Sequence, residues 1–459
     1  MKKNYKHSVS LDVSKCKGCT NCLKRCPTEA IRIRDGRAVI SSDKCIDCGE
    51  CIKACPYKAK KANHDPLSCI GDYKYSIALP APSLYGQFAN MENIGYIIKG
   101  LLEMGFDDVF EVACAAELVS AYTRQYIKRT DIKKPLISSA CPAITRIISM
   151  NYPFLCENVM PILPPVDIAA CLAREKAKNE HPDLTDEDIG IIFISPCPAK
   201  VSYVKNDFAR ERNYIDAVVS VRDVYFELLD KMKKFGDEPL EMTESGMVGI
   251  GWATTGGEST AIFNERYLAA DGIENCIRVL DQIDNEDFSK LDFVELNVCS
   301  GGCVGGAMTV SNPYIAQARL QNLKRYLPVS PNRPASEWIP DKFFNENKIE
   351  YNPSQLLSDD KKTARKMMRE IEEITEKLPK IDCGSCGAPT CMAFAEDIVK
   401  GETTVDECTV IMRKLFHKYL EENKNSSLLG ELKKFPPNGN SNGEKKKETN
   451  TDENNREIK

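Results

Sequence analysis

Cysteine is the residue type in this sequence with the most chemistry to offer. The chain has 21 cysteines but only 4 histidines among its 459 residues, and most of the cysteines fall into groups with short, regular spacing. Thiolates are soft ligands suited to iron–sulfur clusters, whereas zinc sites often add imidazole. The basic residues after Met1 precede no apolar segment, so no signal peptide is expected and the thiols should stay reduced. The cysteines therefore predict metal chemistry rather than disulfides.

Two groups near the start of the chain repeat one spacing of four cysteines, the last followed by proline. Three closely spaced cysteines cap one cubane, while the fourth crosses to the other cluster. A hairpin is expected over residues 31–40, turning at Asp35 and Gly36. These features resemble a bacterial two-cluster ferredoxin, with a pair of zinc sites as the alternative. The predicted ligand sets are Cys16, Cys19, Cys22 and Cys55 for one 4Fe–4S cluster, and Cys45, Cys48, Cys51 and Cys26 for the other.

A third group lies near the end of the chain and has a different spacing. It consists of Cys383, Cys386, Cys391 and Cys408, with glycines in the loop and a helix expected over 393–400. Four cysteines can hold another 4Fe–4S cluster, although the spacing also permits zinc. The group resembles the small iron–sulfur domain of the Rnf electron-transport B subunit and of corrinoid iron–sulfur proteins. Such a domain would serve as an electron relay or as a docking module.

Between these groups, short apolar strands are expected to alternate with helices. Strands are predicted over 75–80, 109–112, 135–138, 190–195 and 293–298, and helices over 115–128 and 213–234. Near-continuous apolar strands separated by helices indicate a buried, largely parallel sheet, which binds ligands beyond the carboxyl ends of its strands. Three of these strands run directly into cysteines. The four central cysteines, enough for one further cubane, are Cys141, Cys197, Cys299 and Cys303.

Together, the loops around the central cysteines resemble the signature motifs of iron-only (FeFe) hydrogenases, over about residues 8–325. Pro196 to Lys200 matches the P-C-x-x-K motif, and Cys299 to Cys303 matches C-x-x-G-C. The resemblance implies that Cys303 bridges a 4Fe–4S cluster to a diiron unit that carries CO, cyanide and a dithiolate. It also implies that Lys200 donates a hydrogen bond to one cyanide. The remaining implied residues are the cubane ligands Cys141, Cys197 and Cys299, and the loop Ala81, Pro82 and Ser83 around the other cyanide.

Several positions depart from the hydrogenase pattern. Ala140 stands where the family has a cysteine that carries protons. Loss of a general acid costs about 10²–10⁴-fold in rate. Further departures are Tyr203 in place of a glutamate, Ser195 and Asn297 in place of methionines, and Ala307 or Met308 in the last motif.

The retained cysteines and the missing proton carrier resemble the sensory type of FeFe hydrogenase that ends in a C-terminal iron–sulfur domain. The implied role is slow, reversible H2 oxidation (H2 = 2 H+ + 2 e−) with low turnover, typical of anaerobic metabolism. Clusters would relay the redox state to a redox or signalling protein partner. One alternative is an electron-transfer or assembly-type iron–sulfur protein that lacks a diiron site. Another is an ordinary ferredoxin-linked hydrogenase with a different proton route.

Some chemically capable residues fall outside these groups. Glu111 and Glu117 are candidates for a substitute proton path, although glutamates on helices are usually solvated. Isolated cysteines are usually small core residues. This applies to Cys69, Cys114, Cys156, Cys171 and Cys276.

Composition and patterning give a multidomain α/β chain. A net charge of -5 argues against nucleic-acid binding. The sequence has no apolar run long enough to span a membrane, so a cytoplasmic protein is expected. The predicted domains are an α+β ferredoxin domain over 1–66, a hydrogenase-like α/β domain over 70–325, a linker over 326–359, a small, mostly helical iron–sulfur domain over 360–415 and a disordered tail over 430–459. Four 4Fe–4S clusters are expected in total.

Overall fold

A computed structural model describes residues 6–206, 213–233, 235, 242–285, 288, 290–345, 347–354 and 356–423. The chain divides into two compact units, Met1–Glu402 and Thr403–Lys459. The tail predicted over 430–459 lies outside the described residues, as does Lys234 at the end of one predicted helix.

The N-terminal part has the small α+β arrangement expected of a two-cluster ferredoxin. Strand β1 (Val9–Leu11) pairs antiparallel with β4 (Lys60–Ala62), and β2 (Ile31–Arg34) with β3 (Arg37–Ile40). The β2–β3 hairpin turns at Asp35 and Gly36, with φ of 49° and 68°. Two consecutive positive φ values are typical of a tight hairpin turn, so the predicted hairpin is confirmed. Between the strands lie α1 (Asn21–Lys24) and α2 (Glu50–Lys53).

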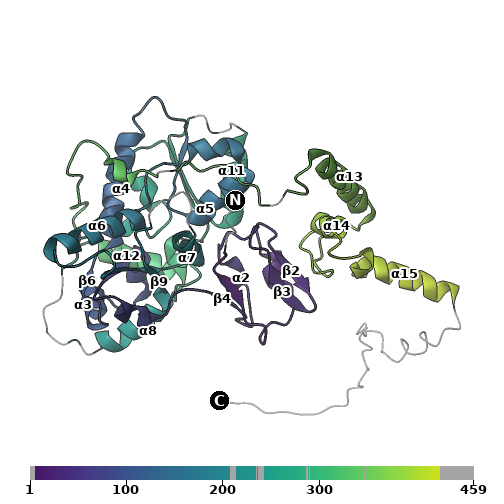
Figure 1. Cartoon of the computed structure of the whole chain (residues 1–459), viewed down its shortest axis with the longest axis horizontal. Coiled ribbons are helices and arrows are strands. Elements are labelled where there is room, and N and C mark those ends of the chain that lie inside the picture. The colour runs from purple at the N-terminus through teal and green to yellow at the C-terminus, as the bar shows by residue number, and fades with distance from the viewer. Residues whose placement is uncertain are drawn as a thin grey trace, which may run out of the picture. The chain divides into compact units, whose positions relative to one another are not determined.

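The central part contains two parallel sheets (Figure 1). The first has the order β6–β5–β8–β9, and the second has the order β10–β11–β7. Every residue of β8 is buried, as expected for an apolar strand covered on both faces. The strand bounds are β5 (Tyr75–Pro80), β6 (Asp108–Val109), β7 (Leu136–Ile137), β8 (Ile189–Ser195), β9 (Ala217–Ser220), β10 (Tyr267–Asp271) and β11 (Phe293–Asn297).

Helices surround these sheets, and two of them begin at candidate ligands. Helix α5 (Pro142–Asn151) follows Cys141, and α7 (Pro198–Lys205) follows Cys197. Proline suits a first helical position because its missing N–H would have no partner there. The other central helices are α3 (Gly95–Glu103), α4 (Val112–Tyr126), α6 (Pro165–Glu180), α8 (Val221–Met232), α9 (Met247–Gly251), α10 (Gly257–Ala261), α11 (Ile273–Asp284) and α12 (Pro313–Lys324).

The prediction of one helix over 213–234 is wrong in its first part. Residues Ala217–Ser220 form strand β9, and α8 begins only at Val221. The Ser220 hydroxyl accepts a hydrogen bond from the Arg222 amide and caps the helix there. The apolar residues of β9 are buried beside β8, and this tertiary pairing outweighs any local helical preference.

The segment predicted as a linker over 326–359 has extensive contacts with the central part where it is described. Phe343 in a short 3-10 turn is buried, and its carbonyl accepts a hydrogen bond from the Leu163 amide at 2.8 Å. The Asn332 amide donates to the Glu117 carboxylate at 2.9 Å. The described stretch therefore packs along the central part as well as connecting it to the C-terminal region.

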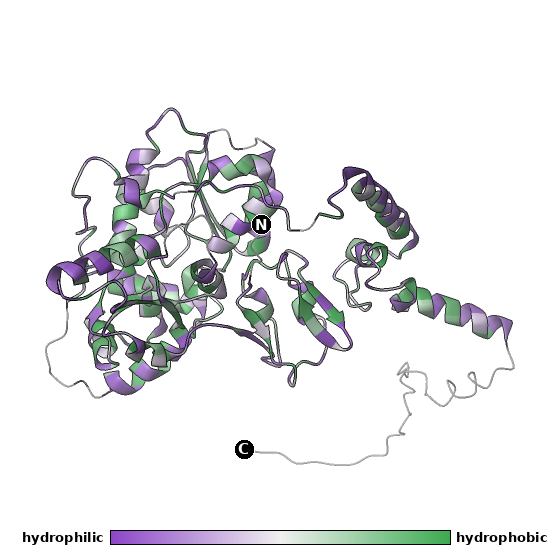
Figure 2. Cartoon of the chain, viewed as in Figure 1, coloured by the Kyte–Doolittle hydropathy of each residue, from purple (hydrophilic) through white to green (hydrophobic). Residues whose placement is uncertain are grey.

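Helices dominate the C-terminal region, as predicted. In the first unit, α13 (Lys361–Lys377) packs against α14 (Cys391–Val399), and Ile371 is the one buried residue of α13. Figure 2 shows both hydrophilic and hydrophobic residues along α13. The second unit contains α15 (Thr409–Glu422) after a short 3-10 turn at Val405–Glu407. Within the described ranges, no helix combines the length and the apolar character needed to cross a membrane.

Candidate metal centres

The four central cysteines lie beyond the carboxyl ends of three strands, two from one parallel sheet and one from the other. Cys141 follows β7, Cys197 follows β8 and Cys299 follows β11, with Cys303 in the next turn. Burial raises the pKa of the Cys197 thiol to about 12; Lys200 opposes this rise, while Cys303 and Cys141 add to it. Burial likewise raises the pKa of Cys299, which also feels the other three thiols. The structure thus brings the four predicted cysteines close enough together for their thiols to interact electrostatically.

This donor set fits an iron–sulfur cluster. Buried thiols that raise one another's pKa do not ionise readily unless a cation stabilises the thiolates. A cubane with four cysteine ligands supplies that cation. The cysteine loops also pack too closely for larger residues at two glycines. A Cβ atom added at Gly306 would lie 2.2 Å from the Pro196 carbonyl oxygen, and one at Gly302 (φ +87°) would lie 2.6 Å from the Thr255 nitrogen.

A small cavity lies beside Cys303. Its lining is mainly apolar, with a few polar groups, as in many ligand sites. It brings together the residues that the hydrogenase resemblance had singled out from separate parts of the chain. These residues are Ala81, Pro82, Ser83, Ala140, Lys200, Asn297 and Cys303.

Lys200 contributes a buried positive charge to this cavity. Burial alone would lower the pKa of Lys200, but the Cys303, Cys197 and Cys141 sulfurs, when ionised, outweigh that effect and raise it. The Lys200 ammonium donates a hydrogen bond to the Ala140 carbonyl at 3.2 Å. An ammonium has three donors, so further donors remain for a bound anion such as cyanide.

Ser83 supplies the second polar feature that fits a cyanide-bearing group. Its side chain is fully buried, and its hydroxyl has no hydrogen-bond partner among the described residues. An unsatisfied buried hydroxyl costs about 1–3 kcal/mol, which an acceptor in the cavity would recover. The orphaned donor and the charged lysine therefore both suit an anionic ligand.

The positions that depart from the hydrogenase pattern each have a definite contact. The Tyr203 hydroxyl donates to Asp167 at 2.5 Å. The Ser195 hydroxyl donates to the Cys197 carbonyl at 3.1 Å, and the Asn297 amide donates to Glu295 at 2.8 Å. In the last motif, Ala307 and Met308 are both buried.

Glu258 is a functional candidate that sequence reasoning missed. It lines the cavity, is buried and accepts a hydrogen bond from the Ser138 hydroxyl at 2.6 Å, while its Oε1 atom has no partner among the described residues. Burial, and then the neighbouring Glu295, raise the pKa of Glu258 well above its ordinary value. Since α10 is distant in sequence from every cysteine motif, no local pattern marks this residue.

The two glutamates considered as substitute proton carriers are buried, not solvated. Glu111 accepts hydrogen bonds from the Tyr85 hydroxyl at 2.9 Å and from the Ser245 hydroxyl at 2.6 Å. Glu117 accepts from the amides of Gly246 and Asn332. Neither residue lines the cavity, so their hydrogen bonds tie loops to α4 instead. The isolated cysteines are all buried, as expected of core residues: Cys69, Cys114, Cys156, Cys171 and Cys276.

Each predicted ferredoxin ligand set also comes together. One cavity is lined by Cys16, Cys19, Cys22 and Cys55 together with Ile33. In the other set, burial raises the pKa of Cys48 well above its ordinary range, with Cys51, Cys26 and Cys45 adding to the effect. The crossing of Cys26 and Cys55 between the two motifs is therefore visible in the fold.

The second ferredoxin loop is held directly against the central site. The Asp47 carboxylate accepts a hydrogen bond from Ser202 of α7 at 2.7 Å. Arg146 of α5 donates to the Cys45 carbonyl at 2.8 Å. Because α5 and α7 begin at Cys141 and Cys197, the same helices contact both cysteine sets.

The C-terminal cysteines are divided between the two units. Cys383, Cys386 and Cys391 belong to the first unit, and Cys408 belongs to the second. The Cys391 amide donates to the Asp382 carboxylate at 2.6 Å, which caps the entry to α14.

Comparison with known families agrees with this geometry. Residues 74–307, just over half of the chain, match the family described as iron only hydrogenase large subunit, C-terminal domain. The chain belongs to the iron-only hydrogenase family. Residues 8–56 of this hydrogenase-like protein match the 4Fe-4S dicluster domain family, and residues 378–410 match a family of Fe–S cluster domains.

Individual relatives align with different parts of this hydrogenase-like chain. The Periplasmic Fe hydrogenase large subunit of Nitratidesulfovibrio vulgaris is 26% identical over an alignment of 376 residues, and the match covers 68% of this chain and 88% of that protein. The Corrinoid/iron-sulfur protein large subunit of Moorella thermoacetica is 46% identical over 39 residues, 8% of this chain and 9% of that protein. A solved FeFe-hydrogenase of Chlamydomonas reinhardtii aligns with a TM-score of 0.44 and 17% identity, covering 59% of this chain and 88% of that one.

Proposed function

We propose that this protein is a slow, H2-sensing FeFe hydrogenase that passes its redox state to a regulatory protein partner. The proposal rests on a contrast between residues that line the same cavity: some could hold the cofactor, whereas another cannot supply a proton. Lys200, Ser83 and Cys303 keep the donors that a diiron unit with cyanide ligands needs. Ala140 lines the same cavity but has no proton to give. A site that holds its cofactor yet lacks the family's proton carrier should bind H2 and turn it over slowly.

Each cysteine set has an assigned place in this proposal. Cys141, Cys197 and Cys299 would hold the central 4Fe–4S cluster, and Cys303 would hold both that cluster and the diiron unit. The two ferredoxin sets hold one cluster each, and the C-terminal group holds a fourth. Cys408 is its fourth ligand on the basis of motif spacing alone. The predicted domain boundaries and the cytoplasmic location stay predictions as well.

The residues that line the cavity have separate roles in this proposal. When bound, the diiron unit supplies the metal at which H2 is split or formed. Lys200 holds the unit through its charge, and the Ser83 hydroxyl donates a hydrogen bond to it. Glu258 lies at the cavity wall, where it accepts a hydrogen bond from Ser138, and its carboxyl group would hold a proton there. The apolar lining keeps water away from the site.

Electrons leave through the ferredoxin clusters in this proposal. The contacts of Asp47 and Arg146 hold the second ferredoxin loop against the helices that begin at the central ligands. The partner that receives the signal is a redox or signalling protein.

Infrared spectroscopy tests the proposal directly. Anaerobically reconstituted protein is incubated with a synthetic diiron cofactor, and CO and cyanide bands that shift under H2 are expected. The Cys303→Ala variant should keep the cluster signals of the central site but lose these bands. Full iron content without any bands in the wild type would instead identify an electron-transfer or assembly-type protein. Rapid turnover with strong bands would identify an ordinary hydrogenase.

A further inference from the structure

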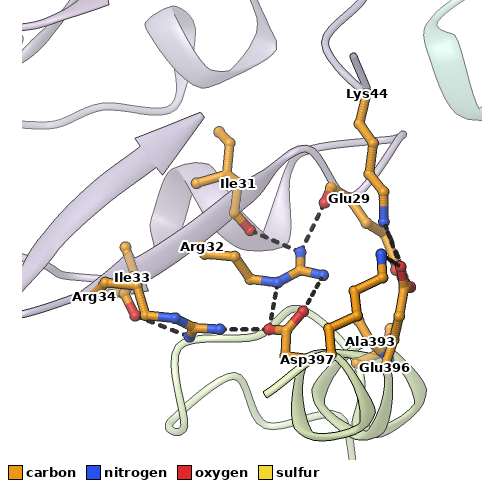
Figure 3. Close-up of polar contacts among 11 residues, drawn as sticks. Glu29, Ile31, Arg32, Ile33, Arg34, Lys44, Ala393, Glu396 and Asp397 are labelled. Carbon is orange, nitrogen blue, oxygen red and sulfur yellow. Dashed lines mark hydrogen bonds and ion pairs between the residues drawn. The ribbon is translucent and has the colours of Figure 1, made fainter. Parts of the chain in front are cut away.

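Two arginines of the ferredoxin hairpin hold one buried aspartate of the C-terminal region (Figure 3). Arg32 donates to both carboxylate oxygens of Asp397, from Nε at 2.7 Å and from Nη2 at 3.1 Å. Arg34 donates to the same carboxylate at 2.5 Å. The Asp397 side chain is only 4% exposed. A buried, bidentate arginine–carboxylate pair has a defined geometry, unlike an exposed ion pair.

A second ion pair lies beside the first. Lys44, which immediately precedes Cys45, contacts Glu396 with an N–O distance of 3.3 Å. Lys400 contacts the same carboxylate at 2.6 Å. The side chains of all three residues are mostly buried. Both carboxylates come from α14, whose first residue is the candidate ligand Cys391.

The backbones on the two sides also touch. The Ile33 amide donates a hydrogen bond to the Gly387 carbonyl at 2.8 Å. Gly387 has φ +82°, and a Cβ atom added there would lie 2.2 Å from the Ile33 oxygen. A Cβ at Gly384 would lie 3.3 Å from the Leu23 side chain. Glycine is thus required at position 387 for so close an approach.

Candidate cluster ligands lie on both sides of this contact. Gly384 and Gly387 flank Cys386 in the C-terminal loop. Across from them, Ile33 lines the cavity of the first ferredoxin cysteine set, and Leu23 directly follows Cys22 of that set. The loop that carries Cys386 therefore packs against residues that surround the first ferredoxin cysteine set.

We infer that this interface docks the C-terminal cluster next to the first ferredoxin cluster and makes it the outer end of the electron path. The inference rests on the proposed binding of 4Fe–4S clusters at these two sites. The order of centres is then the central site, the second ferredoxin cluster, the first ferredoxin cluster and the C-terminal cluster. In the transfer step, one electron leaves the reduced ferredoxin cluster, which is oxidised, and reduces the C-terminal cluster, with no bond formed or broken. Oxidation of one H2 supplies two such electrons.

Electron paramagnetic resonance of the full chain tests the inference without any diiron unit. The protein is reconstituted with iron and sulfide and reduced with dithionite, so failure of the hydrogenase proposal does not affect the result. The wild type should show signals broadened by magnetic interaction between the two clusters. Cys383→Ala with Cys386→Ala removes the C-terminal cluster and supplies the reference spectrum, which is uncoupled from that cluster; any interaction among the other clusters is common to both proteins.

Variants on both sides of the interface separate docking from cluster binding. Asp397→Arg, and independently Arg32→Gln with Arg34→Gln, should retain the wild-type iron content, yet their ferredoxin-cluster signals should be no broader than in the reference, and the signal of the C-terminal cluster should be added to them. Glu376→Gln, which removes one partner of the exposed Lys380 pair, is the matched control and should keep the broadening. A combined exchange, Arg32→Glu with Arg34→Glu and Asp397→Arg, should restore part of it. The inference is overturned if the wild type matches the uncoupled reference, or if the Arg32→Gln, Arg34→Gln protein keeps full broadening.

Discussion

The ammonium of Lys200 lies 3.2 Å from the backbone carbonyl of Ala140 and donates a hydrogen bond to it. This contact joins the lysine proposed to hold a diiron unit to the position proposed to lack the family's proton carrier. Residue 140 and Lys200 therefore line the same small cavity, the one beside Cys303. The contact itself uses only the backbone of residue 140, so the side chain can be changed without removing it.

Restoring a thiol at position 140 should speed H2 turnover. Ala140→Cys places a proton donor in the cavity, and a positioned general acid contributes about 10²–10⁴-fold in rate. The measurement is H2 production and uptake by protein loaded with the synthetic cofactor, normalised to its infrared bands. Ala140→Ser, similar in size but much less acidic, is the control and should give a smaller gain. An unchanged or lower rate in loaded Ala140→Cys protein would exclude Ala140 as the cause of slow turnover.

Removing the buried charge should prevent stable loading of the diiron unit. Lys200→Met keeps an unbranched side chain of similar length but cannot donate to a cyanide, so the infrared bands should weaken strongly or disappear. Before loading, the iron content should equal that of the wild type, because the four central thiols are unchanged. Lys205→Met is the matched control, since that lysine lies on the same helix and pairs with Asp65 at 2.8 Å, outside the cavity. Normal bands in Lys200→Met would contradict the assigned role.

Glu258 should make stability fall as pH rises. Its folded-state pKa is raised from an ordinary 4.5, so above that pH the unfolded chain releases the proton while the folded chain keeps it. The unfolded state then binds fewer protons, and the free energy of unfolding decreases by up to about 1.4 kcal/mol per pH unit until the folded group ionises. Glu258→Gln keeps a polar partner for Ser138 and should flatten this dependence. Anaerobic denaturant unfolding between pH 5 and pH 8 measures it.

The control for this pH dependence is Glu376→Gln at an exposed site, which should follow the wild-type slope. Glu258→Gln should also lower H2 turnover in loaded protein, because it cannot release a proton to the cavity. If Glu258→Gln had the wild-type pH dependence and the wild-type turnover, Glu258 would neither have a raised pKa in the folded state nor hold a proton for the reaction.

The C-terminal motif should account for one complete cluster. Cys383→Ala combined with Cys386→Ala is expected to lower iron by about four atoms per chain, because a 4Fe–4S cubane is not held by the remaining thiols. Cys156→Ala, which alters a buried cysteine outside the motifs, should leave iron unchanged. Iron and zinc are both measured after reconstitution. Loss of zinc alone would identify a zinc site at this motif.

The sequence by itself determined which kinds of centre this protein can have. Ligand spacing is a local property, so the ferredoxin motifs, the C-terminal motif and the central P-C-x-x-K segment were all recognisable from the order of residues. The hairpin at Asp35 and Gly36 and the strand over 190–195 were predictable for the same reason. Strand β9 was missed because its pairing with β8 depends on residues far away in the chain.

Only the tertiary structure decided which distant residues share a site. Glu258 reaches the cavity because α10 packs against β11, and no local signal indicates that position. Glu111 and Glu117 were misjudged because loops from other parts of the chain cover α4 and satisfy their carboxylates. The contact of Arg32 with Asp397 spans 365 residues of sequence. Spacing along a chain specifies ligands that lie close together, whereas burial and long-range pairing depend on how the separate elements pack.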